Sequence, residues 1–300
     1  MIQDKSLSSR LLDVFVHLTM LFVLAITLLP IIHIVAVSLS DPSEILRGHV
    51  SLWPKQFNLR AYFTILNDRV VPRSFLNSVL ITALGTFINI VMTTMMAYVI
   101  SKPEIPFRRL VIGFILVTMF FSGGLIPSFL LVHSLGMYDT IWALVIPGAI
   151  SSYYLIIMHS FFKSFPAELE DAAKIDGCND LQTLWKIVLP LSKAAIATIS
   201  LFYAVGHWNS YFGAYIYLSN KDLFPLQLIL REIILQSTMA ETLARQGMAE
   251  LANEVSSKFS LTPESIQYST LVISIIPMLI IYPFVQRYFV QGVMIGSLKG

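Results

Sequence analysis

The stretch DAAKIDGCNDLQTLWKIVLP, residues 171–190, is polar and helical in pattern, although it lies between two strongly apolar segments. Upstream of it, Pro166 suits the first turn of a helix, where its missing N–H costs nothing, and Gly177 suits the position just after that helix. Asn179 can cap a second helix, with a glutamine three residues later completing a capping box. Pro190 should stop the second helix, because the residue before a proline avoids the α region. These signals predict two short helices joined by a turn.

The second of these helices has one apolar face. Leu181, Leu184, Trp185 and Val188 recur at the spacing i, i+3, i+4 and i+7. Two interpretations fit this face equally well: it packs beneath the chain's own helices, or it docks in a groove of a partner protein. The pattern alone leaves both interpretations open.

Composition places these helices in a membrane protein. Apolar residues make up 56% of the chain and charged residues 13%, with a mean hydropathy of +0.73, whereas about a quarter of an average soluble domain is charged. A bilayer core of roughly 30 Å takes about 20 helical residues to cross. Six apolar runs are long enough, at roughly 12–40, 75–100, 110–132, 141–162, 194–218 and 266–288. Lipid excludes unpaired backbone groups and the alternation of a β-barrel is absent, so we predict an all-α integral membrane protein with six transmembrane helices.

The charges of the short loops predict the orientation. Loop 101–109 carries Lys102, Arg108 and Arg109, whereas loop 133–140 carries no Lys or Arg. Positively charged loops stay in the cytoplasm, so six spans place both termini inside the cell. The predicted cytoplasmic segments also include 1–11, 164–192 and 291–300, and the predicted extracellular segments are 41–74 and 219–265.

Missing motifs exclude several classes of function. None of the 14 glycines is followed by lysine, so the chain lacks the phosphate-binding loop G-x-x-x-x-G-K-[ST] of many ATPases. Spans two to six hold no Asp, Glu or Lys away from their ends, and His33, His159 and His207 are interpreted as packing or hydrogen-bonding residues. No G-x-S-x-G or H-E-x-x-H motif is present, and the single cysteine, Cys178, allows neither an internal disulfide nor a multi-cysteine metal site. We therefore expect transport driven by another protein, without enzyme activity, cofactor, metal or nucleic-acid partner, and a sodium-coupled carrier is the alternative.

The opening stretch resembles the cytoplasmic loop of permease subunits of ATP-binding-cassette importers. That loop has the pattern Glu-Ala-Ala, three residues, Gly, nine residues, Ile, one residue, Leu-Pro. The sequence from Asp171 to Pro190 keeps every spacing of the pattern. Its one departure is Asp171 in place of the glutamate, and the neighbouring Glu170 is a candidate to replace that glutamate in an ion pair with a partner.

Other stretches are similar to the maltose-type, oligosaccharide branch of these permeases. They are FFSGGLIPSFLLVHSLGMYDT at 120–140, FYAVGHWNSYFGAYIYL at 202–218 and GVMIGSLKG at 292–300. The resemblance implies a type I importer fold, with a transmembrane domain over 75–290, in the bacterial cytoplasmic membrane. It also implies a second permease subunit (usually a different chain), two ATPase subunits that bind ATP and Mg²⁺, and an extracellular solute-binding protein. The implied substrate is a carbohydrate, an oligosaccharide by preference, with another solute such as a modified or acidic oligosaccharide as the alternative.

The resemblance also assigns roles to residues. It makes residues 164–192 a coupling loop, which sits in a groove of an ATPase subunit and passes its movement to the transmembrane helices. The implied coupling residues are Glu170, Asp171, Ala172, Ala173, Gly177, Leu181, Leu184, Trp185, Ile187, Leu189 and Pro190. In the fifth span, Trp208, Asn209, Tyr211 and Tyr215 are candidates for the sugar path, because aromatic rings and amides suit sugars. The alternative role for these four residues is packing and hydrogen bonding between helices.

Overall fold

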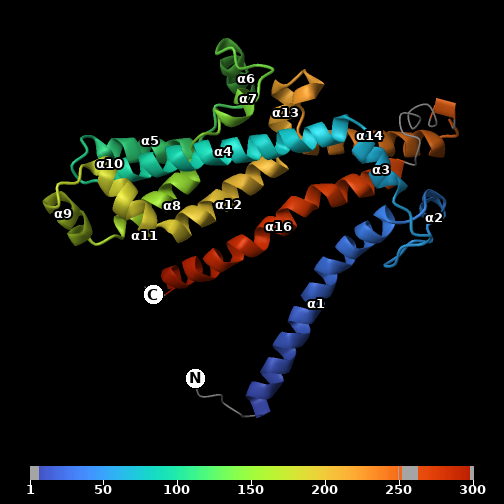
Figure 1. Cartoon of the computed structure of the whole chain (residues 1–300), viewed down its shortest axis with the longest axis horizontal. Helices are drawn as coiled ribbons and strands as arrows, with labels where there is room; N and C mark the ends of the chain where they lie inside the picture. Colours follow the sequence, from blue (N-terminus) through green and yellow to red (C-terminus); the bar gives the residue numbers. More distant parts are fainter. Residues whose placement is uncertain (1–6, 249, 252–262, 298–300) are drawn as a thin grey trace. The chain divides into compact units, whose positions relative to one another are not determined.

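A computed structural model describes residues 7–248, 250–251 and 263–297, and every regular element within those ranges is a helix (Figure 1). This agrees with the predicted all-α class. The chain divides into two compact units, one formed by residues 1–69 and 230–275 and the other by residues 70–229 and 276–300. Two helices contribute to both units, namely α14 (Leu226–Arg245) and α16 (Pro263–Ser297).

The first unit begins with a long apolar helix. Its other elements are α1 (Leu7–Ser38), α2 (Pro42–Leu46) and α3 (Arg60–Asn67). The end of α1 is fixed by Ser38, whose Oγ accepts a hydrogen bond from Tyr62 Oη of α3 at 2.7 Å. Ala36, Val37 and Val50 form a small buried cluster around this end. The rest of α1 exposes apolar side chains, as a helix in contact with lipid does.

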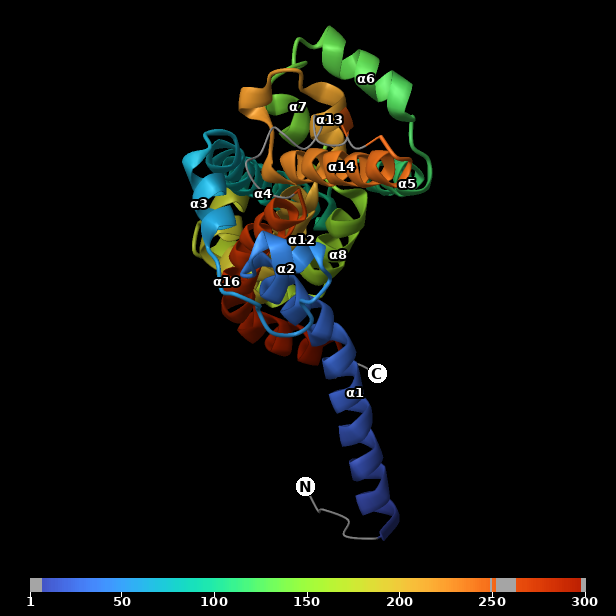
Figure 2. The ribbon, with the colours of Figure 1, turned by 90° about the vertical axis from the view of Figure 1, so that its right-hand side faces the viewer.

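The second unit is a bundle built around α4. Its helices are α4 (Val70–Ser101), α5 (Arg108–Phe120), α6 (Leu125–Ser134), α7 (Trp142–Val145), α8 (Ser152–Lys163), α9 (Ala167–Ile175), α10 (Asp180–Thr183), the π-helical turn η1 (Leu184–Val188), α11 (Leu189–Leu191), α12 (Lys193–Asn209), α13 (Phe212–Tyr217) and the 3₁₀ turn η2 (Lys221–Leu223). Helices α4, α8 and α12 pack side by side (Figures 1 and 2). Their shared core includes Ala97, Leu155, Met158 and Ile199.

Three described helices are long and apolar enough to cross a membrane, over Ser9–Ser38, Val70–Ser101 and Glu264–Pro283. Two bent pairs would raise that number to five. The first pair is Arg108–Phe120 with Leu125–Ser134, bent by 115°, and the second is Asp180–Leu191 with Lys193–Asn209, bent by 84°. The count of six spans therefore stays a prediction.

Three of the predicted spans are not continuous helices. The 110–132 run is divided between α5 and α6 at a glycine pair whose second member, Gly124, has a φ of +88°. The 141–162 run is divided between α7 and α8 around Gly148, and the 194–218 run between α12 and α13. Hydropathy counts apolar residues without regard to backbone conformation, so a long apolar run does not distinguish a straight span from a broken one.

Candidate functional site

The first helix of the coupling loop ends as the sequence predicts. Helix α9 begins at Ala167, after Pro166, and Gly177 follows its end with a φ of +80°. The amide of Cys178 donates to the carbonyl of Ala173 at 2.9 Å, and the amide of Gly177 donates to the carbonyl of Lys174 at 3.0 Å. This pair of bonds is the Schellman motif, in which a left-handed residue pairs the last carbonyls of a helix.

The start of the second helix is also confirmed. Asn179 Oδ1 accepts a bond from the amide of Gln182 at 2.8 Å, and Gln182 Oε1 accepts one from the amide of Asn179 at 3.0 Å. This reciprocal capping box fixes where α10 begins. With both termini capped in this way, the turn between α9 and α10 has a defined geometry.

The prediction that Pro190 stops the second helix is wrong. Leu189 has helical dihedrals, with φ −61° and ψ −47°, and the helix continues through α11 to Leu191. A π-helical turn precedes the proline, and in it the amide of Leu189 donates to the carbonyl of Leu184. Such a wide turn shifts the bonding pattern and accommodates a residue that has no N–H to donate. The chain then bends by 84° into α12.

The apolar face of the second helix divides between two environments. Leu184 and Val188 are each 4% exposed and belong to the core shared with α4, α8 and α12. Leu181 and Trp185 are 57% and 64% exposed, and Ile175, at the end of α9, is 86% exposed. The two interpretations of this face therefore apply to different residues: part of it packs on its own bundle, and part is open to a partner.

The remaining predicted coupling residues also divide. Ala173 is buried, and Glu170, Ile187 and Leu189 are half-buried, whereas Asp171, Ala172, Gly177 and Pro190 are exposed. The exposed set lies with Ile175, Leu181 and Trp185 on the part of the loop that its own bundle leaves uncovered. The motif marks the loop, but it does not separate the residues that anchor it from those that face outwards.

Glu170 is committed to a partner within the chain. Its Oε2 accepts a hydrogen bond from Lys102 Nζ, immediately after α4, and the two side chains are only 27% and 12% exposed. The Lys102 ammonium also lies 4.4 Å from the centroid of the Tyr98 ring. Burial alone would lower the pKa of Lys102, but its interactions with Glu170 and Tyr98 outweigh burial and raise that pKa. Glu170 is therefore paired within the chain in this structure, whereas the neighbouring Asp171 is exposed, and which of them binds a partner stays a prediction.

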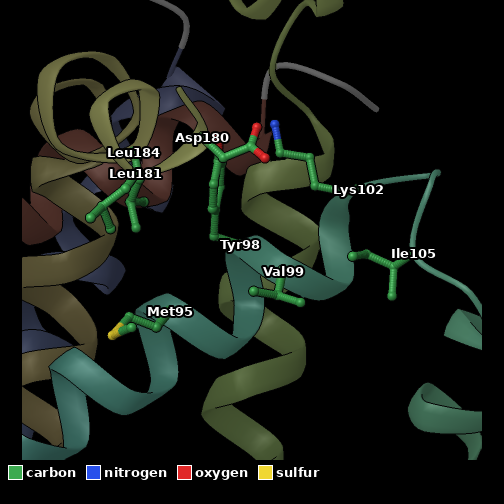
Figure 3. A pocket seen from close by; sticks show the side chains of 8 residues that line it. All are labelled: Met95, Tyr98, Val99, Lys102, Ile105, Asp180, Leu181 and Leu184. Atoms are coloured by element: carbon green, nitrogen blue, oxygen red, sulfur yellow. The ribbon is translucent and has the colours of Figure 1, made fainter. Parts of the chain in front are cut away.

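A pocket of about 250 Å³ separates the end of α4 from the second helix of the loop (Figure 3). Its walls are Met95, Tyr98, Val99, Lys102, Ile105, Asp180, Leu181 and Leu184. The charged ends of Lys102 and Asp180 are directed to the same side of it (Figure 3). The Tyr98 side chain is 5% exposed, and its hydroxyl interacts with the Lys102 ammonium. The loop is thus held to α4 at points rather than along a continuous packed surface.

A buried polar network holds the break between α7 and α8. Asn89 Nδ2 donates to the carbonyl of Gly148 at 2.5 Å, and Asn89 Oδ1 lies 2.6 Å from His207 Nε2. One turn along, Tyr203 Oη accepts a bond from the amide of Ser151 at 3.0 Å. The side chains of α4 and α12 therefore satisfy backbone groups that the break has freed, as a chain in lipid requires. His207 is the hydrogen-bonding residue that was predicted.

The four residues predicted for the sugar path differ in burial. Trp208 is buried and its ring meets that of Phe75 edge to face, with the centroids 5.8 Å apart. Asn209 at the end of α12, Tyr211 just before α13 and Tyr215 within α13 are exposed. Trp208 packs against another helix in this structure, and contact of any of the four with sugar stays a prediction.

An aromatic cluster joins α6 and α13, and no pattern in the sequence indicates it. The rings of Phe129 and Tyr217 stack with centroids 6.1 Å apart, and Tyr138 and His133 complete the group. Tyr138 Oη is 2.7 Å from Ser219 Oγ, and this bond joins the two segments. These residues lie within 120–140 and 202–219, but nothing in their spacing indicates that the two segments meet. The described residues contain no group of three His, Cys, Asp or Glu side chains that could hold a metal ion.

Comparisons with known proteins agree with the resemblance. Residues 80–295 match the family described as "binding-protein-dependent transport system inner membrane component". The chain is 40% identical to the "Polygalacturonan/rhamnogalacturonan transport system permease protein YtcP" of Bacillus subtilis (strain 168), and the alignment covers 98% of this chain and 100% of that one. It is also 40% identical to "Protein LplC" of the same organism, over 92% of this chain and 90% of that one. It also matches a chain of a bacterial ABC transporter involved in the import of the acidic polysaccharide alginate, with a TM-score of 0.84, 33% identity, and coverage of 95% of this chain and 99% of that one.

Proposed function

Because the chain belongs to the family of inner membrane components of binding-protein-dependent transport systems, we propose that it is the membrane-spanning permease subunit of a carbohydrate ABC importer. It works with a second permease subunit, two ATPase subunits and an extracellular binding protein. The chain itself has no phosphate-binding loop, so ATP and Mg²⁺ are bound by the ATPase subunits. In this assembly the chain crosses the cytoplasmic membrane six times, with both termini in the cytoplasm.

The observation that carries this proposal is that the coupling loop has one apolar part buried in its own bundle and another exposed to solvent. Leu184 and Val188 anchor the loop to its own bundle, while Ile175, Leu181 and Trp185 present apolar side chains outwards. An amphipathic helix of this kind suits a hydrophobic groove of a soluble partner. Asp171, exposed one helical turn before Ile175, supplies a carboxylate for a basic residue of the partner. The loop leads directly into α12 through the 84° bend, so its displacement moves a transmembrane helix.

The substrate we propose is an acidic oligosaccharide. This was the alternative to a neutral oligosaccharide, and two comparisons favour it, since one relative is named for polygalacturonan and rhamnogalacturonan and the matching structure for alginate. The helices α4 and α12 carry no Lys or Arg between Arg73 and Lys102 or within the body of α12. These two helices therefore offer no fixed positive charge to an acidic sugar, and we assign selection of the acidic groups to the binding protein and the second permease subunit.

An uptake measurement tests the function and the substrate together. The chain would be reconstituted in liposomes with its permease partner, the ATPase and the binding protein, and offered labelled oligogalacturonides or a neutral maltooligosaccharide. We expect ATP-dependent uptake of the acidic sugar, and none without the ATPase. Uptake of only the neutral sugar would overturn the substrate assignment. Uptake by this chain alone on a sodium gradient would overturn the importer assignment and favour a secondary carrier.

Gly177 provides a separate test of the loop as a lever. Its φ of +80° favours glycine, and a Cβ built there has no atom within 4 Å, so a substitution acts through backbone strain alone. We expect Gly177→Val to cost about 1–2 kcal/mol locally and to misalign α9 with α10. ATP hydrolysis should then continue without matching sugar uptake. Gly177→Asn is the matched control, because asparagine tolerates the left-handed region. Equal uptake per ATP in the valine variant and the wild type would contradict the lever role.

A further inference from the structure

Helix α4 is bonded to neighbouring segments at both of its ends. At its start, Arg73 Nε and Asn77 Nδ2 donate to the carbonyl of Asp222 at 3.0 and 2.8 Å, and Arg73 also forms an ion pair with the Asp222 carboxylate. Ser78 Oγ accepts a bond from the amide of Leu226 at 2.8 Å. At the other end, Lys102 binds Glu170 of the coupling loop. The proposed topology makes the first group of contacts extracellular and the last one cytoplasmic.

The Lys102–Glu170 pair is the charged contact between α9 and the bundle. Between residues that the structure describes, no other ion pair joins 164–192 to a different element. Leu184 and Val188 of the second helix belong to the same buried cluster as Tyr98 and Ile100 of α4, and Leu184 and Lys102 both line the pocket. The pair is therefore a direct charged link between α9 and the end of α4, beside the apolar packing of the second helix.

Resting on the proposed function, we infer that Lys102 and Glu170 are positioning residues for transport, forming the joint through which α4 and the ATPase-bound loop move together. When the loaded binding protein reaches the extracellular side, displacement of the turn at Asp222 shifts α4. The Lys102–Glu170 joint passes that shift to α9. Both side chains are largely removed from water. The contact suits this use because salt screens a partly buried ion pair less than one at the surface.

Asp180 is a second acid near Lys102, and the joint works only if Lys102 pairs with Glu170 instead of Asp180. It lines the pocket that Lys102 also lines, and it begins the second helix of the loop. If Lys102 were to pair with Asp180 instead, the cation would hold α10, and α9 would lose its charged link to α4. A Glu170→Gln change removes the acid on α9 while keeping the shape of the side chain. That variant therefore tests whether Lys102 must be paired with α9, because a pair between Lys102 and Asp180 of α10 would still be possible in it.

The experiment measures how strongly sugar-loaded binding protein stimulates ATP hydrolysis by the reconstituted importer. We expect Lys102→Met and Glu170→Gln each to reduce that stimulation by about tenfold, while the ATPase subunits still co-purify. The double variant should be no worse than either single one, because both remove the same contact. Lys102→Arg should restore most of the stimulation. Glu168→Gln, the same change at an exposed position of α9, should have no effect.

Three outcomes would overturn the inference. In the first, the single variants assemble and are stimulated normally. In the second, the two losses add in the double variant, which would show that the residues act separately. In the third, both single variants fail to assemble while Glu168→Gln assembles, which would make the pair a structural contact. None of these outcomes would contradict the proposed function, which is tested separately by ATP-dependent uptake and by the exposed residues of the loop.

Discussion

A Trp185→Asp variant should insert in the membrane and fold, but lose the ATPase subunits during purification. Trp185 is 64% exposed on the coupling loop, between Leu181 and the anchoring residue Val188. A large aromatic side chain of this kind is a typical energetic centre of an interface. Placing a carboxylate in an apolar groove removes that contact and buries a charge, which is costly when the charge is unpaired. We expect a loss of about 2–4 kcal/mol of binding free energy, or roughly 30- to 1000-fold in affinity.

The neighbouring Leu184 gives the matched comparison. It is 4% exposed within the chain's own core, so Leu184→Asp should reduce the yield of folded chain rather than detach the ATPase from a folded one. Size-exclusion chromatography of the detergent-solubilised complex measures both quantities, as the amount of monodisperse chain and the amount of ATPase that elutes with it. Wild-type amounts of ATPase on the Trp185→Asp chain would show that this face does not dock there. The proposed interface would then be wrong.

Local signals in the sequence predict the coupling loop well. The Schellman motif at Gly177 and the capping box at Asn179 depend on residues at most five positions apart, so the sequence contains all of their determinants. The all-α class is likewise predictable, since it follows from composition and the length of the apolar runs. These are the features in which each backbone bond is made within one short segment.

Features that depend on contacts between segments are not predictable in this way. The helix passes Pro190 because a π-helical turn precedes it, and that turn belongs to a segment whose buried residues pack on other helices. Glu170 has the charge and place of a partner-binding acid, but Lys102, which is 68 positions away, takes it. The break at Gly148 is stable because Asn89 bonds its carbonyl. In each case the structure depends on residues distant in the sequence, and rules based on the spacing of neighbouring residues cannot predict such contacts.

The contact between α4 and α12 leads to the second large effect. Gly85 of α4 lies against His207 of α12, and a Cβ added at Gly85 would be 2.5 Å from His207 Nε2 and 2.6 Å from Cε1. Real atoms do not approach so closely, so Gly85→Ala must displace the imidazole or separate the helices. Either response lengthens the 2.6 Å contact between His207 and Asn89, the residue that also holds Gly148. The change therefore reaches the break between α7 and α8 through one shared side chain.

We expect Gly85→Ala to lower the stability of the folded chain by about 2–6 kcal/mol, since overpacking costs about 1–3 kcal/mol and an unsatisfied buried polar group a further 1–3 kcal/mol. Thermal unfolding in detergent, followed by the loss of monodisperse protein, measures this change. Gly206→Ala is the control: it adds the same methyl group next to His207 in sequence, where no atom lies within 4 Å, so it should be neutral or slightly stabilising as alanine favours helix. A second variant, Gly85→Ala with His207→Ala, removes the clash and should regain the overpacking part of the loss but not the lost hydrogen bond. If Gly85→Ala unfolds at the same temperature as Gly206→Ala, the close approach of α4 and α12 at His207 is not part of the folded bundle, and the network that holds the break must be formed differently.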